Sequence, residues 1–205
     1  MKVIGITGGV GAGKTTVLNI IQDNCSCFIL IADEAAHEVK KRGTPCYDEL
    51  VTLLGADILA PDGEIDKNKM AARIFGDNNR ELLSAVNAIV HPRVKEYILA
   101  LIDEHRKAED VDYFFIEAAL LIEDGYKAIC DELWYIYASR KVRAERLRIT
   151  RGYSDAKIDG IMSSQSDEET FRRNCDHVIE NDGDLDLTER MIKGLLRGGE
   201  SDGRG

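Results

Sequence analysis

The sequence lacks several features that mark common protein classes. It has no Cys-x-x-Cys pair, and Cys25 and Cys27 lack the spacing of a zinc knuckle, so no cysteine-ligated zinc is expected. Its five cysteines are an odd number, which predicts reduced thiols in a cytoplasmic protein. No apolar run approaches the length of a membrane span, and the N-terminus enters an apolar strand directly. We therefore expect neither a membrane helix nor a signal peptide.

Positive charge is also scarce. The chain has 27 Lys and Arg against 37 Asp and Glu, for a net charge of −10. This balance argues against a protein that coats nucleic acid or an anionic membrane, so any local basic cluster is informative. With 205 residues, 44% of them hydrophobic, and no internal repeats, the chain suits one α/β domain with an insertion.

A glycine-rich stretch at residues 7–16 matches the pattern G-x-x-x-x-G-K-[ST]. An apolar strand is expected before it, over residues 2–6, and an apolar helix face after it, over residues 17–21. The glycines let successive N–H groups point at an anion, and the helix start adds its positive dipole end. Lys14 is expected to bridge the outer phosphates and the Thr15 hydroxyl to ligate Mg²⁺. The alternative, a glycine-rich turn that binds nothing, is disfavoured by the strand and helix around it.

Two further expected strands, at residues 28–32 and 113–116, are each followed closely by an acidic residue. Asp33 has two interpretations: the N-cap of a helix over residues 35–41, or a carboxylate that faces the phosphate loop and accepts a proton from a substrate hydroxyl. Glu117 follows the pattern of a second phosphate-site acid, which orients Mg²⁺ through water. Both acids would lie at the carboxyl ends of their strands, where open α/β sheets bind ligands.

Helical patterns without a strand fill residues 61–108. Before them, Thr44 and Pro45 open a helix that stops at Gly55. Asp66 then caps a short helix, and a longer one is expected from about Asn79 to Val90. His91-Pro92 is expected to break the pattern, which resumes over residues 93–106. We interpret residues 61–108 as a helical subdomain inserted between strands two and three.

A basic helix is expected between the Ser139 cap and Gly152. Its basic residues are Arg140, Lys141, Arg143, Arg146, Arg148 and Arg151, against the single acid Glu145. One interpretation is a solvated helix face; the other is an arginine lid, over about 139–165, that closes on ATP and stabilises the transferring phosphoryl group. Further strands are expected at residues 133–137 and 177–180. Capped helices are expected after Ser154 and Ser166, and the closing helix spans residues 185–196.

Together these elements predict an α/β fold. It is a P-loop NTPase with three α/β/α layers, a parallel five-stranded sheet, a helical insert subdomain and an arginine-rich lid. The nucleotide-binding core would comprise residues 1–60 and 109–197, the acceptor subdomain residues 61–108, and a disordered tail residues 198–205.

Several motifs together resemble the dephospho-coenzyme A kinase family, in order from residue 1 to about 197. They are ITGGVGAGKT at residues 6–15, Ala32-Asp33, DGEID at 62–66, His91-Pro92, LLIE at 120–123, Trp134, ERL at 145–147 with Arg151, Gln165, and DHVIEN at 176–181. The sequence departs from the family's usual residues at Ala119, Ile122 and Lys67, which lie on the acceptor side.

The resemblance implies a kinase that moves the ATP γ-phosphoryl group onto the ribose 3′-hydroxyl of dephospho-coenzyme A. Asp33 would be the general base, Arg146 and Arg151 the lid arginines, and His91 part of the acceptor site. Asn181 would approach the adenine. The implied ATP-binding residues of the loop are Gly9, Gly11, Ala12, Gly13, Lys14, Thr15 and Thr16. Mg²⁺ would be the cofactor, and ATP and dephospho-coenzyme A the partners, without nucleic acid or membrane. A monomer is the expected state, with an oligomer as the alternative.

Two other functions compete with this one. A nucleoside or nucleotide kinase of similar layout would share the loop and the lid. A nucleotide-dependent switch would need a guanine-reading Asn-Lys-x-Asp, but Asn68-Lys69 is followed by Met70-Ala71. The chain therefore resembles a nucleotide-dependent switch in its fold only.

Overall fold

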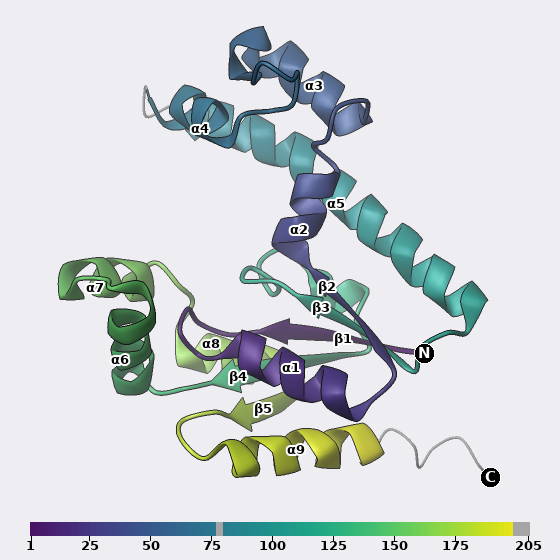
Figure 1. Ribbon diagram of the computed structural model, residues 1–205, viewed down its shortest axis with the longest axis vertical. Coiled ribbons are helices and arrows are strands. Elements are labelled where there is room, and N and C mark those ends of the chain that lie inside the picture. The colour runs from purple at the N-terminus through teal and green to yellow at the C-terminus, as the bar shows by residue number, and fades with distance from the viewer. Residues whose placement is uncertain (77–79, 199–205) are drawn as a thin grey trace. The chain divides into compact units, whose positions relative to one another are not determined.

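The computed structural model describes residues 1–76 and 80–198, and Figure 1 shows their course. The chain forms two compact units, Met1–Leu30 with Ala108–Gly205, and Ile31–Lys107. The second unit begins well before residue 61, where the sequence places the helical subdomain, because two earlier helices belong to it. The functional division into core, acceptor subdomain, lid and tail stays a prediction, and the tail beyond Gly198 lies outside the described residues.

The first unit holds the sheet. Its strands are β1 (Lys2–Thr7), β2 (Cys27–Ile31), β3 (Tyr113–Glu117), β4 (Glu132–Tyr137) and β5 (His177–Glu180). They lie in the order β2-β3-β1-β4-β5; β1 pairs in parallel with β3 and β4, and β4 with β5. The expected parallel five-stranded sheet is thus confirmed, with β1 at its centre. The central strands are apolar along their length because helices cover both of their faces.

Helices of the first unit lie on both sides of the sheet. They are α1 (Lys14–Asn24), α6 (Arg140–Arg151), α7 (Asp155–Ser163), α8 (Glu168–Asn174) and α9 (Leu185–Gly198). Figure 1 shows α1 in front of the sheet and α8 behind it, while α9 packs against α1 and β5. These are the three layers that the sequence predicts. Helices α6 and α7 pack together at the carboxyl end of β4, the position expected for the lid.

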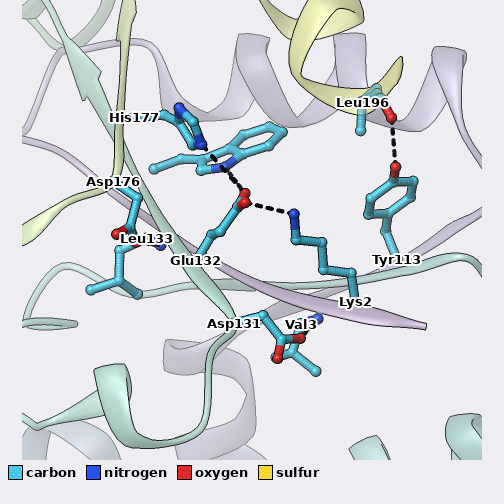
Figure 2. Close-up of polar contacts among 10 residues, drawn as sticks. Lys2, Val3, Tyr113, Asp131, Glu132, Leu133, Asp176, His177 and Leu196 are labelled. Atoms are coloured by element: carbon cyan, nitrogen blue, oxygen red, sulfur yellow. Dashed lines mark hydrogen bonds and ion pairs between the residues drawn. The ribbon is translucent and has the colours of Figure 1, made fainter. Parts of the chain in front are cut away.

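Acidic side chains lie at the opposite end of the strands, where β4 and β5 begin (Figure 2). The Glu132 carboxylate accepts hydrogen bonds from Lys2 Nζ at 2.6 Å and Trp134 Nε1 at 3.1 Å, and lies 3.6 Å from His177 Nε2. Asp131 accepts from the Val3 amide at 2.7 Å. Burial opposes ionisation of Glu132, but the hydrogen bonds from Lys2 and Trp134 outweigh it and lower its pKa. Glu132 is therefore an anion that joins β1 to β4 and β5.

Asp176 bonds β4 in the same way as Asp131 bonds β1. Asp176 accepts a hydrogen bond from the Leu133 amide at 2.8 Å, and its own amide donates to the Leu133 carbonyl at 2.8 Å. Each aspartate precedes a strand and bonds the neighbouring strand through both side chain and backbone. These bonds set the register at the edge of the sheet that lies away from the phosphate loop.

The second unit is helical. Its elements are α2 (Ala32–Glu38), α3 (Pro45–Leu54), the 3₁₀ helix η1 (Ala56–Ile58), α4 (Lys67–Phe75) and α5 (Arg80–Ala108). Thr44 caps α3 by accepting from the Tyr47 amide, and Asp66 caps α4 by accepting from the amides of residues 68 and 69, as the sequence predicts. Both α3 and α4 pack on η1.

The break predicted at His91-Pro92 is wrong, because α5 runs through both residues as one helix. Proline costs the helix one N–H donor but has a helical φ, so packing can retain it. Four buried residues supply that packing on one face, on both sides of the proline: Val86, Val94, Ile98 and Ile102. Asn79, where a separate helix was expected to begin, lies outside the described residues.

The structure excludes the N-cap interpretation of Asp33, and the cap predicted at Ser166 is wrong. The N-cap of α2 is Ile31, so Asp33 lies inside the first helical turn and does not cap it. Asp167, and not Ser166, caps α8 by accepting from the Thr170 amide at 2.7 Å. The Ser166 hydroxyl instead donates to Glu123. In each case a strand or a tertiary contact shifts the helix start by one or two residues.

The cysteines are free thiols. Burial is the largest cause of the raised pKa of Cys25 and of Cys130, each to about 12. Within the described ranges, none of the helices combines the length and the apolar character that crossing a membrane requires.

Candidate active site

The phosphate loop joins β1 to α1 and has the backbone that its glycines predict. The backbone φ angles of Gly8, Gly11 and Gly13 are 154°, 82° and 90°, values that residues other than glycine rarely adopt. Gly13 is the N-cap of α1 and supplies no side-chain cap, and the first turn of α1 carries no acidic residue. The amides at this helix start are thus available to an anion, and the helix dipole favours one.

Lys14 extends back along the loop. Its ammonium group donates to the Gly8 carbonyl at 2.8 Å and lies 3.4 Å from the Glu117 carboxylate. Glu117 ends β3, which pairs directly with β1, so the two strands bring this carboxylate to the loop. The structure thus places two sequence-predicted residues, Lys14 and Glu117, side by side.

The last strand also reaches the loop. The Asn181 side chain, only 2% exposed, donates to the Ala12 carbonyl at 2.7 Å. Arg146 donates to the Asn181 carbonyl at 2.8 Å and to the Ala12 carbonyl at 3.2 Å. Helix α6 and the end of β5 are thus joined to the loop at Ala12. All three residues are among those that the sequence predicts to bind ATP or to be catalytic.

Two further residues contact the loop, and neither is among the site residues predicted from the sequence. The Arg143 guanidinium donates to the Val10 carbonyl at 2.9 Å, and the Gln165 side-chain oxygen accepts from the Val10 amide at 3.2 Å. Arg143 lies one helical turn before Arg146 on the same face of α6, which is a signal that the sequence does contain. For Gln165, after the end of α7, the resemblance was the only signal.

The arginines of α6 divide into two groups. Arg140 and Arg148 are exposed and pair with Asp159 and Asp155, each at 2.6 Å. Arg143 and Arg146 face the loop, and for neither of them is an ion pair found among the described residues. Arg151 is exposed and lies 6.0 Å from the centre of the Tyr153 ring. Arg143 and Arg146 therefore bring positive charge to the loop, where an anionic ligand could bind.

Asp33 and His91 belong to the second unit, so their roles toward the loop stay predictions. Both side chains are exposed. Within that unit, Lys40 is half-buried, and burial is the largest cause of its lowered pKa; Lys67 lowers the pKa further, while Cys46 and Asp33 act in the opposite sense. Asp33 thus interacts electrostatically with Lys40.

The residues at the loop fit a magnesium ion bound together with a nucleotide. Thr15 is exposed in the first turn of α1, and Glu117 offers a carboxylate, and both are hard oxygen ligands. Across residues 1–76 and 80–198, no group of three or more His, Cys, Asp or Glu side chains is arranged to hold a metal. Phosphate oxygens and water would therefore supply most of the ligands, as is usual for Mg²⁺ in kinases.

Comparisons with known proteins agree with this geometry. A family model described as dephospho-CoA kinase matches residues 2–186. A dephospho-CoA kinase of Moorella thermoacetica is 36% identical over 94% of this chain and 90% of its own length. A crystal structure from Thermus thermophilus superimposes with a TM-score of 0.77 at 27% identity, covering 96% of this chain and 97% of that one. A dephospho-CoA kinase of Campylobacter jejuni shares the fold, with a TM-score of 0.69 at 21% identity, covering 96% of each chain.

The match therefore covers nearly the whole sequence, including the loop, the helical unit and α6. It also excludes the switch interpretation, since the family consists of kinases. On these grounds the chain belongs to the dephospho-CoA kinase family.

Proposed function

We propose that this protein transfers the γ-phosphoryl group of ATP to the ribose 3′-hydroxyl of dephospho-coenzyme A. The products are coenzyme A and ADP, and the reaction is the last step of coenzyme A biosynthesis. The observation that carries the phosphoryl-transfer part is the loop, with its open helix start and Arg146, which contacts the loop and has no carboxylate partner among the described residues. The acceptor is inferred from the named activity of the relatives.

On the nucleotide side, each residue has a proposed role. Loop residues Gly9, Gly11, Ala12, Gly13 and Thr16 shape or supply the amides around the β- and γ-phosphates. Lys14 would leave Glu117 and the Gly8 carbonyl to bridge the same phosphates, because a phosphate offers it more charge. Asn181 would lie near the adenine.

Thr15, with Glu117 acting through water, would hold Mg²⁺. When bound, the ion would neutralise charge on the phosphate oxygens.

On the acceptor side, Asp33 is proposed to take the proton of the ribose 3′-hydroxyl. The oxygen then forms a bond to the γ-phosphorus while the bond from that phosphorus to ADP breaks. Arg146 and Arg151 would stabilise the charge on the transferring group, and His91 would contribute to acceptor binding. We further propose that the protein acts as a cytoplasmic monomer, without nucleic acid or membrane.

The direct test mixes the purified protein with Mg-ATP and dephospho-coenzyme A and follows coenzyme A by mass spectrometry. We expect rapid conversion, while adenosine and nucleoside monophosphates are left untouched. If those acceptors are phosphorylated and dephospho-coenzyme A is not, the protein is a nucleotide kinase. Protein that binds no ATP would contradict the proposal as a whole.

A further inference from the structure

The phosphate loop is bound at Val10 by two side chains to which the mechanism above gives no role. Arg143 Nε donates to the Val10 carbonyl at 2.9 Å, and Arg143 Nη2 donates to the Gln165 side-chain oxygen at 2.5 Å. The same Gln165 oxygen accepts from the Val10 amide at 3.2 Å. These bonds close a ring, which we call the Val10 clamp. The Val10 amide and carbonyl belong to different peptide units, so the clamp holds both units that flank its Cα atom.

Arg143 is held by geometry more than by charge. Its guanidinium is half-buried, yet among the described residues it donates hydrogen bonds to a carbonyl and a side-chain amide oxygen. Arg140, on the same helix, is exposed and bonds Asp159. A guanidinium presents its donors in a rigid plane, so two fixed acceptors orient it fully. Two bonds from one plane also orient the groups that accept them.

Gly9 provides a second, independent sign of this arrangement. A Cβ atom on Gly9 would lie 2.2 Å from Arg143 Nη2 and 2.3 Å from Arg143 Cζ. Unlike Gly8, Gly11 and Gly13, Gly9 has no positive φ that would require glycine. A side chain at position 9 would therefore displace the Arg143 guanidinium from the Val10 clamp.

We propose that Arg143 and Gln165 are positioning residues of the phosphate loop. They fix the peptide units on both sides of Val10, so that the loop is shaped for a triphosphate before ATP arrives. The inference rests on the proposed ATP-dependent function, but not on the identity of the acceptor. Because the loop holds the β- and γ-phosphates both before and during transfer, its shape contributes equally to ground state and transition state. Disrupting the clamp should therefore weaken ATP binding and leave kcat nearly unchanged.

Two substitutions of Gln165 separate this role from a simple charge effect. Gln165→Leu removes the shared acceptor but leaves the charge of Arg143 free for phosphate. Gln165→Glu keeps an acceptor for both Val10 and Arg143 but neutralises that charge. If positioning is what matters, Leu should raise the Kd and the KM for Mg-ATP about tenfold to a hundredfold, the cost of unpaired donors. Glu should stay within about threefold of the wild type.

The measurements are calorimetric titration with Mg-ATP in the absence of acceptor, steady-state kinetics, and thermal unfolding as a check on folding. Arg140→Gln is the control for charge. It removes an arginine charge from α6, the helix that carries Arg143, but at a position away from the loop, and it should change the Kd for Mg-ATP by less than about threefold. The proposal is overturned if Gln165→Leu binds ATP like the wild type, if Gln165→Glu loses as much as Leu, or if kcat falls in place of affinity.

A double-mutant cycle supplies a second route that avoids Gln165. Gly9→Ala should displace the Arg143 guanidinium, and Arg143→Met should remove it while keeping the aliphatic packing. If both act through the clamp, the double variant should bind ATP no more weakly than the worse single variant, whereas additive losses would contradict the inference. Failure of the proposed acceptor would leave the ATP titrations intact, so the two failures can be told apart.

Discussion

Asp33 lies in the first turn of α2, where its exposed side chain does not cap the helix. Because the Asp33 carboxylate accepts no capping hydrogen bond from α2, it can accept a proton from a substrate. We predict that Asp33→Asn lowers turnover with dephospho-coenzyme A at least about a hundredfold, the usual contribution of a general base. Mg-ATP affinity should be unchanged, because Asp33 has no proposed contact with the phosphates.

The control for this variant is Glu34→Gln, which neutralises the adjacent exposed acid and should keep near-normal turnover. Initial rates of coenzyme A formation measure both variants. Near-normal turnover of Asp33→Asn would remove Asp33 from the mechanism.

Glu132 illustrates a residue whose charge serves the fold. Its pKa is lowered in the folded protein, against burial, by hydrogen bonds from Lys2 and Trp134. A lowered carboxyl pKa stabilises the fold above the ordinary value of 4.5, and this contribution disappears as pH falls through the lowered pKa. We predict that Glu132→Gln loses about 1 kcal/mol of unfolding free energy at pH 7, because charge-assisted hydrogen bonds weaken.

Urea unfolding followed by circular dichroism at pH 7 and at pH 3.5 tests this prediction. The difference between wild type and variant should shrink at the lower pH. Glu189→Gln, at an exposed pair with Lys193, is the control and should matter little at either pH. An equal difference at both pH values would mean that ionisation of Glu132 is not the cause.

At the scale of elements, α5 shows how packing overrides a local signal. Pro92 is exposed and lies inside the helix. We predict that Pro92→Ala stabilises the protein by about 1–2 kcal/mol, because the restored N–H donor and relieved clash outweigh the greater freedom of the unfolded chain. Denaturant unfolding followed by circular dichroism measures the change.

Pro45→Ala is the matched comparison, since Pro45 is at the first position of α3, where proline fits the helix. It should have the opposite sign and destabilise by up to about 1 kcal/mol. If both substitutions destabilise, Pro92 contributes packing that outweighs its helical cost.

A buried hydroxyl links β5 to α9. Thr188 donates to the Glu180 carbonyl at 2.9 Å and lies 3.4 Å from the Asn181 side-chain oxygen. We predict that Thr188→Val destabilises the protein by about 1–3 kcal/mol, because the Glu180 carbonyl loses the hydrogen bond from the Thr188 hydroxyl. It should also weaken Mg-ATP binding several-fold, since Asn181 loses a neighbour that orients it.

Unfolding curves and ATP titrations provide the two readouts. Thr188→Ser keeps the hydroxyl and should retain most of the affinity. If Thr188→Val binds Mg-ATP as tightly as the wild type, the hydroxyl does not orient Asn181.

For the whole molecule, ligand binding should be visible in unfolding. Trp134 is the single tryptophan and is 1% exposed in the first unit, so its fluorescence reports the unit that holds the loop. Mg-ATP at about a hundred times its Kd should add about 2.7 kcal/mol of stability. For a chain of this size, that corresponds to a rise of about 5–10 °C in the Tm of the Trp134 transition. Adenosine, which lacks phosphates, should raise it far less, and equal shifts would argue against phosphate binding at the loop.

The sequence alone determined the class of the protein, because its strongest signals are local. The phosphate loop, the apolar strands and the basic helix can each be recognised from a few adjacent residues, and the motif series identified the family. The tertiary structure decided which side chains serve the loop. Helical periodicity places Arg143 and Arg146 on one face, but only the packing of α6 shows that this face, and not Arg140 or Arg148, contacts the loop.

Gln165 and the continuity of α5 required the tertiary structure for the same physical reason. Gln165 contacts Val10 across 155 positions of sequence, a distance at which no local pattern operates. Pro92 is a helix breaker in isolation, but apolar residues buried on both sides of it keep the helix continuous. Local chemistry thus determined what this protein does, and long-range packing decided which residues position it.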